Sequence, residues 1–267
     1  MPVTRPLWLD DAERRRQVET APGNDAYFGF ERIRAAEKTR RVVRHFDSVA
    51  HVYDAMNSLL SFGIHHAWKR AAVRMLGLRP GERILDVCGG TGDLARLAAR
   101  RVGPRGRVVI YDINRAMIAA GLPKLNASGL AARIRHVQGD AEEIAFRDGS
   151  FDAVMVGFGI RNVTRMRRGF DEMQRVLAPG GRLLCLEFSR PVSPLFRWLY
   201  DAYSFHAMPF LGELIAGSRR AYTHLPESIR MFPLPDELSG LLHAAGFSRV
   251  DYRRFTNGIA VAHLAVT

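Results

Sequence analysis

The chain has 267 residues, 47% of them hydrophobic, which fits one globular domain or a domain with a cap. Its two cysteines, Cys88 and Cys185, fall in predicted interior strands, so we expect no disulfide framework and no metal site. Acidic residues near the start argue against a secretory signal, and no stretch reaches the roughly 18–20 apolar residues of a membrane span. We expect a cytoplasmic protein that contacts the inner face of the membrane.

The formal net charge is +12. A positive balance of this size favours anionic partners, such as an acidic membrane surface or nucleic acid. The alternative is that the many arginines are solvated surface residues that reflect a compositional bias. Charge therefore suggests a class of partner without identifying one.

The first quarter of the chain divides into a tail and a helical cap. Residues 1–26 are charged and end in an Ala-Pro-Gly-Asn-Asp run, which predicts a disordered tail. Residues 27–76 form the predicted cap, where apolar residues such as Val42, Phe46 and Val49 recur at spacings of three and four. We expect a break in this helical segment around residues 61–63, after which the helix resumes and runs through Trp68 to Leu76.

An alternation of strands and helices follows the cap. Strands are predicted at residues 83–88, 107–113, 134–138, 151–156 and 182–188. The helices between them are predicted at residues 94–102, from Arg115 until Pro123 interrupts the helix, and at 166–177, with a turn at 179–181. Such alternation predicts a parallel sheet with helices on both faces.

The C-terminal segment predicts a helix at residues 236–245 and two strands at 249–255 and 259–265, which the turn signal Asn257-Gly258 separates. The two strands add an antiparallel hairpin to the sheet. We therefore predict an α/β fold of the Rossmann-like class I methyltransferase type for residues 77–267. It would be a doubly wound, seven-stranded, mostly parallel sheet with a C-terminal antiparallel hairpin and an N-terminal helical cap.

A glycine-rich turn, DVCGGTGD at residues 86–93, joins the first predicted strand to its helix. Glycine lets the backbone approach a ligand closely, and the helix directs its N–H groups at whatever binds there. The turn lacks the third glycine of a dinucleotide fingerprint and has no lysine to hold phosphates. Gly89, Gly90, Thr91 and Gly92 therefore predict a site for a nucleoside cofactor without a pyrophosphate, of which S-adenosylmethionine is the common case.

Three aspartates stand at the carboxyl ends of the first three predicted strands of the sheet, where ligands of doubly wound sheets bind. Asp112 lies about 20 residues after the glycine turn, the separation at which a carboxylate reaches ribose hydroxyls. Asp140, with Ala141 beside it, would meet the adenine, and Asp86 or the turn next to it would face the amino-acid end. For any one of them the alternative is a helix cap or a turn former.

The chain resembles the UbiE-type ubiquinone/menaquinone biosynthesis C-methyltransferases over nearly its whole length. The glycine turn alone would identify only a methyltransferase, and the other motifs make the resemblance specific. They are FDSVA at 46–50, YDAMN at 53–57, SFGIH at 61–65, WKR at 68–70, YDIN at 111–114, FGIRNV at 158–163, LEFS at 186–189, YDAYSF at 200–205 and ESIR at 227–230.

The resemblance implies transfer of a methyl group from S-adenosylmethionine to a ring carbon of a polyprenylated quinol. It also implies cofactor contacts at Thr91, Asp112, Asp140, Ala141 and Gly157, the last in place of a usual serine. A larger departure lies at residues 217–224, GSRRAYTH, where the family is similar to Asn-Asp-x-x-Ser-Tyr-x-Tyr. This segment is expected near the substrate mouth, so the departure bears on which substrate is methylated.

A ring carbon becomes nucleophilic when the neighbouring phenol, with a pKa near ~10, loses its proton. Arg161, after the fourth strand, is the first candidate to stabilise the phenolate, and Asn162 would orient it. The alternative for Arg161 is a structural pair with an interior carboxylate. Either His65 or His206 would be a base.

Tyr203 and Tyr222 would hydrogen-bond a quinol oxygen, and Glu187 ends the fifth strand in the crevice. Ordinary structural roles remain the alternative for each of these residues and for both histidines.

Residues 194–214 are aromatic and apolar. They predict the core of a substrate lid over residues 194–230 that also touches a membrane surface. The alternative is an ordinary buried helix pair.

Two other functions stay open. One is methylation of another apolar phenolic metabolite, and the other is a non-catalytic subunit of a quinone-biosynthesis assembly. We expect no nucleic-acid partner, because the extra RNA-binding module and the N/D-P-P-[F/Y] motif of RNA methyltransferases are absent from the sequence. A homodimer or a larger assembly is consistent with the sequence, which does not choose between benzoquinol and naphthoquinol.

Overall fold

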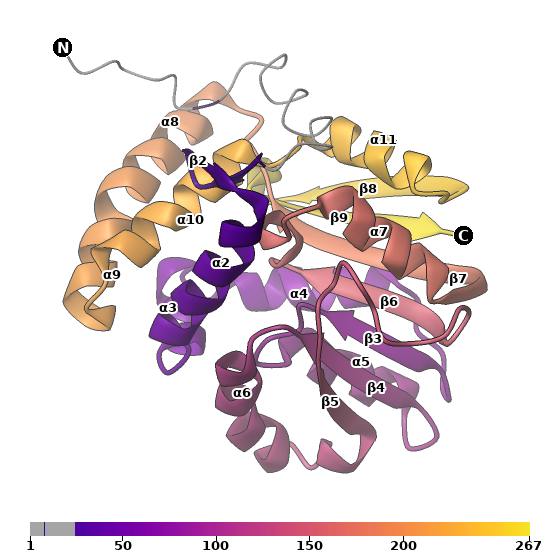
Figure 1. Cartoon of the computed structure of the whole chain (residues 1–267). Coiled ribbons are helices and arrows are strands. Elements are labelled where there is room, and N and C mark those ends of the chain that lie inside the picture. Colours follow the sequence, from indigo (N-terminus) through magenta and orange to yellow (C-terminus); the bar gives the residue numbers. More distant parts are fainter. Residues whose placement is uncertain (1–7, 9–24) are drawn as a thin grey trace.

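A central sheet of seven strands, with helices packed on both faces, organises the protein (Figure 1). The computed structural model describes Trp8 and residues 25–267. The strand order is β5-β4-β3-β6-β7-β9-β8, in which β3 to β7 run parallel and β9 is antiparallel to both of its neighbours. The strands are β3 (Arg83–Val87), β4 (Arg107–Asp112), β5 (Ile134–Gln138), β6 (Phe151–Gly157), β7 (Leu177–Phe188), β8 (Arg249–Phe255) and β9 (Ala260–Val266).

Successive residues of the inner strands pack into two different cores, because side chains alternate between the faces of a sheet. Ile84 belongs to the core on one face and Leu85 to the core on the other, and both are fully buried. Helices α4 (Ile64–Met75), α5 (Asp93–Val102) and α6 (Arg115–Ala127) contribute to the first core. Helices α7 (Met166–Arg175) and α11 (Pro235–Ala244) contribute to the second. The sheet is therefore doubly wound, as the sequence predicts.

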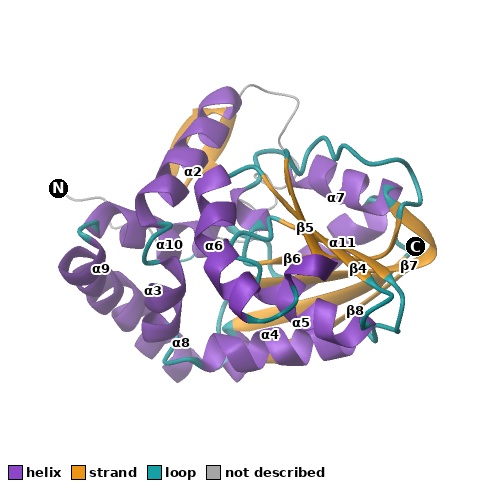
Figure 2. Cartoon of the chain, turned by 90° about the horizontal axis from the view of Figure 1, so that it is seen from below, coloured by secondary structure: helices purple, strands orange, loops and turns teal. Residues whose placement is uncertain are grey.

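The remaining helices form a cap and a lid that gather to one side of the sheet (Figure 2). The cap consists of the hairpin β1 (Asp25–Phe28) and β2 (Glu31–Arg34) followed by α2 (Ala35–Val49) and α3 (Tyr53–Leu60). The lid consists of α8 (Pro194–Ala202), the π-helical turn η3 (Tyr203–Ala207), α9 (Met208–Ala216) and α10 (Arg219–Met231). Met56 and Leu60 of the cap pack with Met208 and Tyr222 of the lid in a third apolar core.

The predicted fold class and C-terminal hairpin are confirmed, and so is the helical break at residues 61–63, since α3 ends at Leu60 and α4 begins at Ile64. Three local expectations are wrong. The helix α6 continues through Pro123. Residues 179–181 lie inside a single strand, β7, where the pairing with β6 jumps from Phe151↔Leu177 to Ala153↔Arg182. The turn residues therefore make a bulge in this strand. Cys88 follows β3 and is half-buried, so it is not an interior strand residue.

The predicted disordered tail falls mostly on residues 1–7 and 9–24, which lie outside the described residues. Trp8 is described, and its indole nitrogen lies 3.1 Å from each carboxylate oxygen of Asp201 in the lid. The β1–β2 hairpin was not predicted. Among the described residues, no helix combines the length and the apolar character that crossing a bilayer requires.

Candidate functional site

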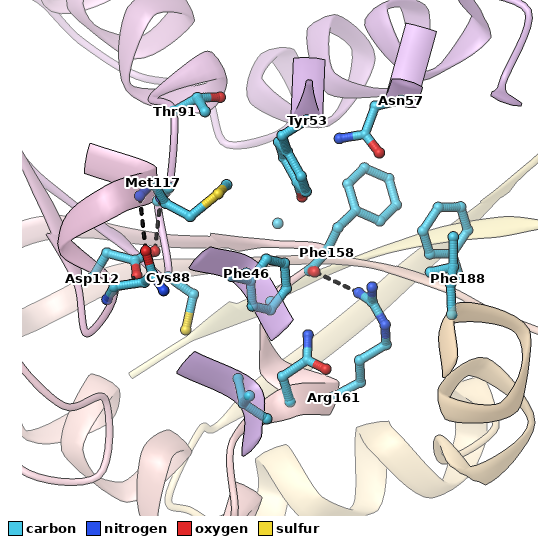
Figure 3. A pocket seen from close by; sticks show the side chains of 18 of the residues that line it. Phe46, Tyr53, Asn57, Cys88, Thr91, Asp112, Met117, Phe158, Arg161 and Phe188 are labelled. Carbon is cyan, nitrogen blue, oxygen red and sulfur yellow. Dashed lines mark hydrogen bonds between the residues drawn. The ribbon is translucent and has the colours of Figure 1, made fainter. Parts of the chain in front are cut away.

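One cavity of about 480 Å³ lies between the carboxyl ends of the central strands and the helices of the cap and lid. The strand order reverses at β3, so the chain continues to β4 on one side and β6 lies on the other, which creates the crevice where such sheets bind ligands. Figure 3 shows part of the lining from close by. The lining includes Phe46, Tyr53, Asn57, His65, Asp86, Gly89, Gly90, Thr91, Asp112, Asp140, Ala141, Gly157, Phe158, Arg161, Asn162, Phe188, Tyr203, Tyr222 and His224.

Two non-glycine residues with positive φ mark the floor of the cavity. Cys88, directly after β3, has φ of 53°, and Phe158, directly after β6, has φ of 57°. Such conformations are costly for residues with a side chain and occur preferentially at functional sites. The backbone turns sharply at both strand ends, and these turns open the crevice between them.

The glycine turn splits into residues that line the cavity and one that supports the helix. Gly89 and Gly90 line it, and a Cβ atom on Gly89 would lie 2.8 Å from the carbonyl oxygen of Asp86. Gly92 has φ of 80° at the start of α5, where a Cβ would lie 2.7 Å from Cδ1 of Ile110. Gly92 is absent from the described lining, so its role is to let the turn enter α5 and not to contact a ligand.

Asp112 is held by two backbone donors at the end of β4. Its Oδ2 accepts a hydrogen bond from the amide of Gly90 at 2.8 Å, and its Oδ1 accepts one from the amide of Asn114 at 2.8 Å. Burial raises the pKa of this carboxyl, and the two hydrogen bonds oppose that rise. Each oxygen keeps a second lone pair for a ligand hydroxyl.

Asp86 is more deeply buried than Asp112 and accepts fewer hydrogen bonds. Its Oδ2 accepts a hydrogen bond from the amide of Ala95 at 2.8 Å, while its buried Oδ1 has no partner among the described residues. Burial raises the pKa of Asp86 to about 7, and the Ala95 hydrogen bond only partly offsets this. A carboxyl poised near neutrality beside the glycine turn can accept a proton or a ligand cation.

Asp140 and Ala141, which are predicted to meet the adenine, lie in the loop after β5 and line the cavity. Asp140 is half-buried and accepts a hydrogen bond from the amide of Glu142 at 2.9 Å, and Ala141 is buried. At Gly157, where the resemblance implies a serine, a Cβ would lie 2.6 Å from Cδ1 of Leu94. The end of the Leu94 side chain therefore occupies the space that a serine would need.

A cluster of charged and polar groups ties the cap to the glycine turn. The hydroxyl of Thr91 donates to Asp54 of α3 at 2.7 Å. The ammonium of Lys124 lies 2.7 Å from Asp54 and 2.6 Å from Asp93, and that of Lys69 lies 2.8 Å from Asp93. Burial would raise the pKa of Asp93, but the two lysines outweigh it and hold this pKa well below its usual range.

This cluster also decides whether a cation fits nearby. His65, His66 and Asp93 bring three ligand atoms within 4.8 Å of one another. Both oxygens of Asp93, however, are already paired with lysine ammonium groups. Two positive charges therefore stand where a metal ion would have to bind, which disfavours a metal at this place.

Arg161 and Glu187 form a buried ion pair beside the cavity. Nη1 of Arg161 lies 3.0 and 3.2 Å from the two carboxylate oxygens of Glu187, and it also donates to the carbonyl oxygen of Phe158 (Figure 3 draws the latter bond). The guanidinium carbon lies 5.6 Å from the centre of the Phe188 ring, and Nε donates to Ser228 at 3.3 Å. Burial raises the pKa of Glu187, and Arg161 opposes the rise. Arg161 therefore makes the carboxylate pair that the structural alternative requires, and it also lies on the cavity wall, as the role in stabilising a phenolate requires.

The other catalytic candidates separate into three that the structure brings to the cavity and one that it does not. Asn162 lines it with a buried Nδ2 that has no partner among the described residues. Tyr203 lines it and donates to the carbonyl oxygen of Leu60 at 2.9 Å. His65 lines it too, but burial lowers its pKa to about 4, which makes it a weak base. His206 is exposed and absent from the described lining.

An aromatic wall borders the cavity, formed by the lining rings of His45 and His224 with Phe28 packed against them. Phe28 stacks on His224 with ring centroids 3.8 Å apart, and His45 lies 5.1 Å from the same ring. Burial lowers the pKa of His45 to about 4 and that of His224 to about 2, so both rings are neutral at physiological pH. Within the unusual segment 217–224, His224 reaches the cavity, whereas Arg219 and Arg220 are exposed.

Several residues of the site carry no simple sequence signal. Asp54 and Lys124 meet only because α3 and α6 converge on the glycine turn. Lys38 of α2 is buried, with burial lowering its pKa to about 8, and it donates to the carbonyl oxygen of Val163. Phe188 is the third residue of the Leu-Glu-Phe-Ser motif and could have been found from its place at a strand end.

A family model described as the ubiE/COQ5 methyltransferase family matches residues 34–267. The chain is similar to a protein of Stutzerimonas stutzeri named "Ubiquinone/menaquinone biosynthesis C-methyltransferase UbiE", with 48% identity over 90% of this chain and 94% of the relative. It is 45% identical to the protein of the same name from Ectopseudomonas mendocina, over 96% of this chain and 99% of the relative.

Solved structures resemble the fold at lower sequence identity. A SAM-dependent methyltransferase of Aquifex aeolicus aligns with a TM-score of 0.54 and 19% identity, over 74% of this chain and 88% of that one. The [4+2]-cyclase SpnF aligns with a TM-score of 0.62 and 17% identity, over 85% of this chain and 95% of that one. At this level of identity, the likeness establishes the fold alone.

Proposed function

Because this chain belongs to the ubiE/COQ5 methyltransferase family, we propose that it transfers a methyl group from S-adenosylmethionine to a ring carbon of a demethylated polyprenyl quinol. The similar proteins named above carry ubiquinone and menaquinone biosynthesis in their names. The observation that carries the proposal is a largely apolar cavity with Arg161 and an aromatic wall beside the glycine turn. Such a cavity suits a flat phenolic ring better than a polar metabolite.

The residues of the glycine turn and its neighbours fit the cofactor. Gly89 and Gly90 leave their backbone open to the cavity, and Asp112 keeps acceptor capacity for a ribose diol. Asp140 and Ala141 are assigned to the adenine. The unpartnered Oδ1 of Asp86 suits the ammonium of the amino-acid end. Thr91 is already bonded to Asp54, so it supports the site by fixing the cap.

The sulfonium methyl group of the bound cofactor supplies the electrophile. The protein's task is to align the quinol and to remove its phenolic proton. Arg161 holds positive charge against the developing phenolate, and Glu187 keeps the guanidinium in place. The new carbon–carbon bond would replace the methyl–sulfur bond of the cofactor. The methylated carbon would then lose its proton while the ring oxygen regains one, so that a single proton is released in total.

The cap and the lid would exclude water from this reaction. Tyr203 and Tyr222 line the cavity from the lid, and burial raises the pKa of Tyr222 to about 12, so that hydroxyl stays protonated and available as a donor. We further propose that the protein works in the cytoplasm at the inner membrane face, where prenylated quinols reside. A homodimer or a quinone-biosynthesis complex is compatible with this arrangement.

The test is a mass-spectrometric methylation assay with purified protein and S-adenosylmethionine. Chemically reduced demethylated benzoquinol and naphthoquinol are supplied separately, with bulk RNA as the control substrate. We expect a gain of one methyl group on at least one quinol, which also identifies the ring that is used. Cofactor binding without any methylated quinol would indicate that another phenol is the substrate. Lack of cofactor binding would refute the proposal.

A further inference from the structure

The lid exposes an unusual number of large apolar side chains. Leu195 and Trp198 of α8 are each 66% exposed, and Phe210 and Leu214 of α9 are 58% and 70% exposed. Scattered single apolar residues are normal on a protein surface, but a contiguous group marks an interaction site. These four residues need a partner that removes them from water.

These residues lie along one side of a nearly continuous helical segment. Helix α8, the π-helical turn η3 and α9 follow one another from Pro194 to Ala216 without an intervening loop. The steps from Leu195 to Trp198 and from Phe210 to Leu214 are three and four residues, the spacing of neighbours on one helix face. The opposite side of the same segment is already used, since Tyr200 and Met208 are buried inside the lid.

The cavity reaches this surface at the α3–α4 loop. Phe62 lines the cavity and is nevertheless 84% exposed, so it stands at an opening. Its ring lies 5.9 Å from that of Tyr203 in η3, which places the opening next to the lid segment. Leu59 and Ile64 on either side of Phe62 are also exposed, at 43% and 39%. An apolar rim therefore continues from the opening onto the lid.

Charge favours an anionic partner for this surface. Arg197 lies within α8, and Arg220 is exposed at the start of α10, while the neighbouring Arg219 pairs with Glu213. The acidic residues of the same segment are already paired, Asp201 with the buried Arg230 and Glu213 with Arg219. Exposed apolar side chains together with arginines in one helical segment are typical of helices that lie in the interface of an anionic bilayer.

We propose that the outer face of α8–η3–α9, together with the loop around Phe62, docks on the surface of an anionic lipid bilayer. Docking in this orientation points the cavity opening at the membrane. A prenylated quinol would then enter ring first past Phe62 while its tail stays in lipid. The inference rests on the proposed function for the identity of the substrate, but the docking itself is measured without any turnover.

The binding test uses vesicles of phosphatidylcholine with and without phosphatidylglycerol, some of them carrying brominated acyl chains that quench tryptophan. We expect the protein to float with the anionic vesicles and its fluorescence to be quenched by the brominated lipid. Trp198→Phe should keep the flotation and lose most of the quenching, because Trp68 is buried and Trp8, the third tryptophan, is half-buried against Arg230. The combined variant L195S/W198S/F210S should bind at least tenfold more weakly. Leu122→Ser, at an exposed position on α6, is the matched control and should bind as the parent does.

The kinetic test compares two substrates. The combined variant should lose its rate on a prenylated quinol held in vesicles and keep, within twofold, its rate on a tail-less quinol in solution. If neither protein methylates the tail-less quinol, the proposed function fails while the binding result still stands.

Two outcomes would overturn the docking proposal. In one, the combined variant binds vesicles as tightly as the parent. In the other, light scattering finds a dimer whose Trp198 emission is already blue-shifted without lipid and shifts back on dilution. That second outcome would assign the same face to a second copy of this chain.

Discussion

At the scale of single residues, the hydrogen bonding and charge pairing of side chains in this site depend more on burial than on their neighbours in the sequence. Asp86 and Asp112 both end inner strands, yet both oxygens of Asp112 accept hydrogen bonds, whereas one oxygen of Asp86 has no partner among the described residues. Arg161 and Glu187 come from neighbouring strand ends and neutralise each other inside the protein. Such buried pairs are costly to break, because the remaining charge is left without a partner.

Cofactor affinity should depend on pH through Asp86. Its pKa is about 7, so the ionised form that attracts an ammonium group accumulates as pH rises through that value. We expect affinity for S-adenosylhomocysteine to rise about tenfold between about pH 6 and pH 8, and Asp86→Asn to remove the rise. Isothermal titration calorimetry measures this, with Asp152→Asn at the far end of the strands as a control. An unchanged pH profile in Asp86→Asn would disprove the assignment.

Arg161→Gln should lower kcat on the quinol about 100-fold and leave cofactor affinity within about twofold, because the lost charge acts on the developing phenolate. Arg161→Lys should recover part of the rate. Glu187→Gln should have a smaller effect on kcat and lower the melting temperature, since it leaves Arg161 buried without its carboxylate. Steady-state kinetics with both quinols provides the measurement, and an unaltered kcat in Arg161→Gln would exclude the role given to it.

At the scale of elements, packing against neighbouring elements overrides proline and glycine residues that predict a break in a helix or strand. Pro123 lies inside α6, and the helix continues because its other residues are held against the sheet and the glycine turn. Residues 179–181 bulge within β7 because the strand is paired on both sides of them. Proline and glycine signals predict where regular structure is locally weak, while the neighbouring elements decide whether it ends there.

Replacing Pro123 with alanine should stabilise the protein by about 2 kcal/mol. Proline disfavours a helix interior by about 3 kcal/mol relative to alanine, and the more flexible unfolded chain returns part of that gain. The side chain is exposed, so no packing is lost. Urea unfolding measures the difference, and the neighbouring exposed Leu122→Ala should change stability little. A variant less stable than the parent would mean that α6 uses the proline geometry.

At the scale of the whole molecule, polar contacts join the cap to the sheet domain at several points. Asp54 joins Thr91 and Lys124, and Lys38 and Thr39 of α2 bond to the loop after β6. These links close the cavity over the glycine turn. The pair of Asp54 and Lys124 is partly exposed and individually weak, which suits a cap that must open to admit ligands.

Asp54→Asn should loosen the cap without unfolding the sheet. The lost pair is worth about 1 kcal/mol, so amide hydrogens in α2 and α3 should exchange roughly fivefold faster. Those in β3 and β6 should exchange at the parent rate. Hydrogen exchange with mass spectrometry resolves the two regions. Equal acceleration throughout would indicate global destabilisation in place of local opening.

Acid stability should depend on Asp93. Its folded pKa is depressed, so the stability it contributes is present above its unfolded pKa of about 4 and is lost as pH falls below that value. Thermal unfolding between about pH 3 and pH 7 should show a steep acid limb that Asp93→Asn flattens, with a loss of about 3 kcal/mol at pH 7. An acid limb that is unchanged in this variant would place the effect in other carboxylates.

The sequence by itself determined the fold class, the glycine turn, the three strand-end aspartates and the family. Those features could be predicted because they depend on residues that are close together along the chain: hydrophobic periodicity, strand-to-helix turns and short motifs. Arg161 was identifiable for the same reason, since it lies in a motif directly after a strand.

Only the tertiary structure decided the partners of these residues. It paired Arg161 with Glu187, joined Asp54 to Lys124 and left His206 at the surface. It also gathered Phe62 and the apolar face of the lid around one opening. Each of these depends on how helices far apart in the chain converge on the sheet, and the burial they create sets both the charges and the exposed surface.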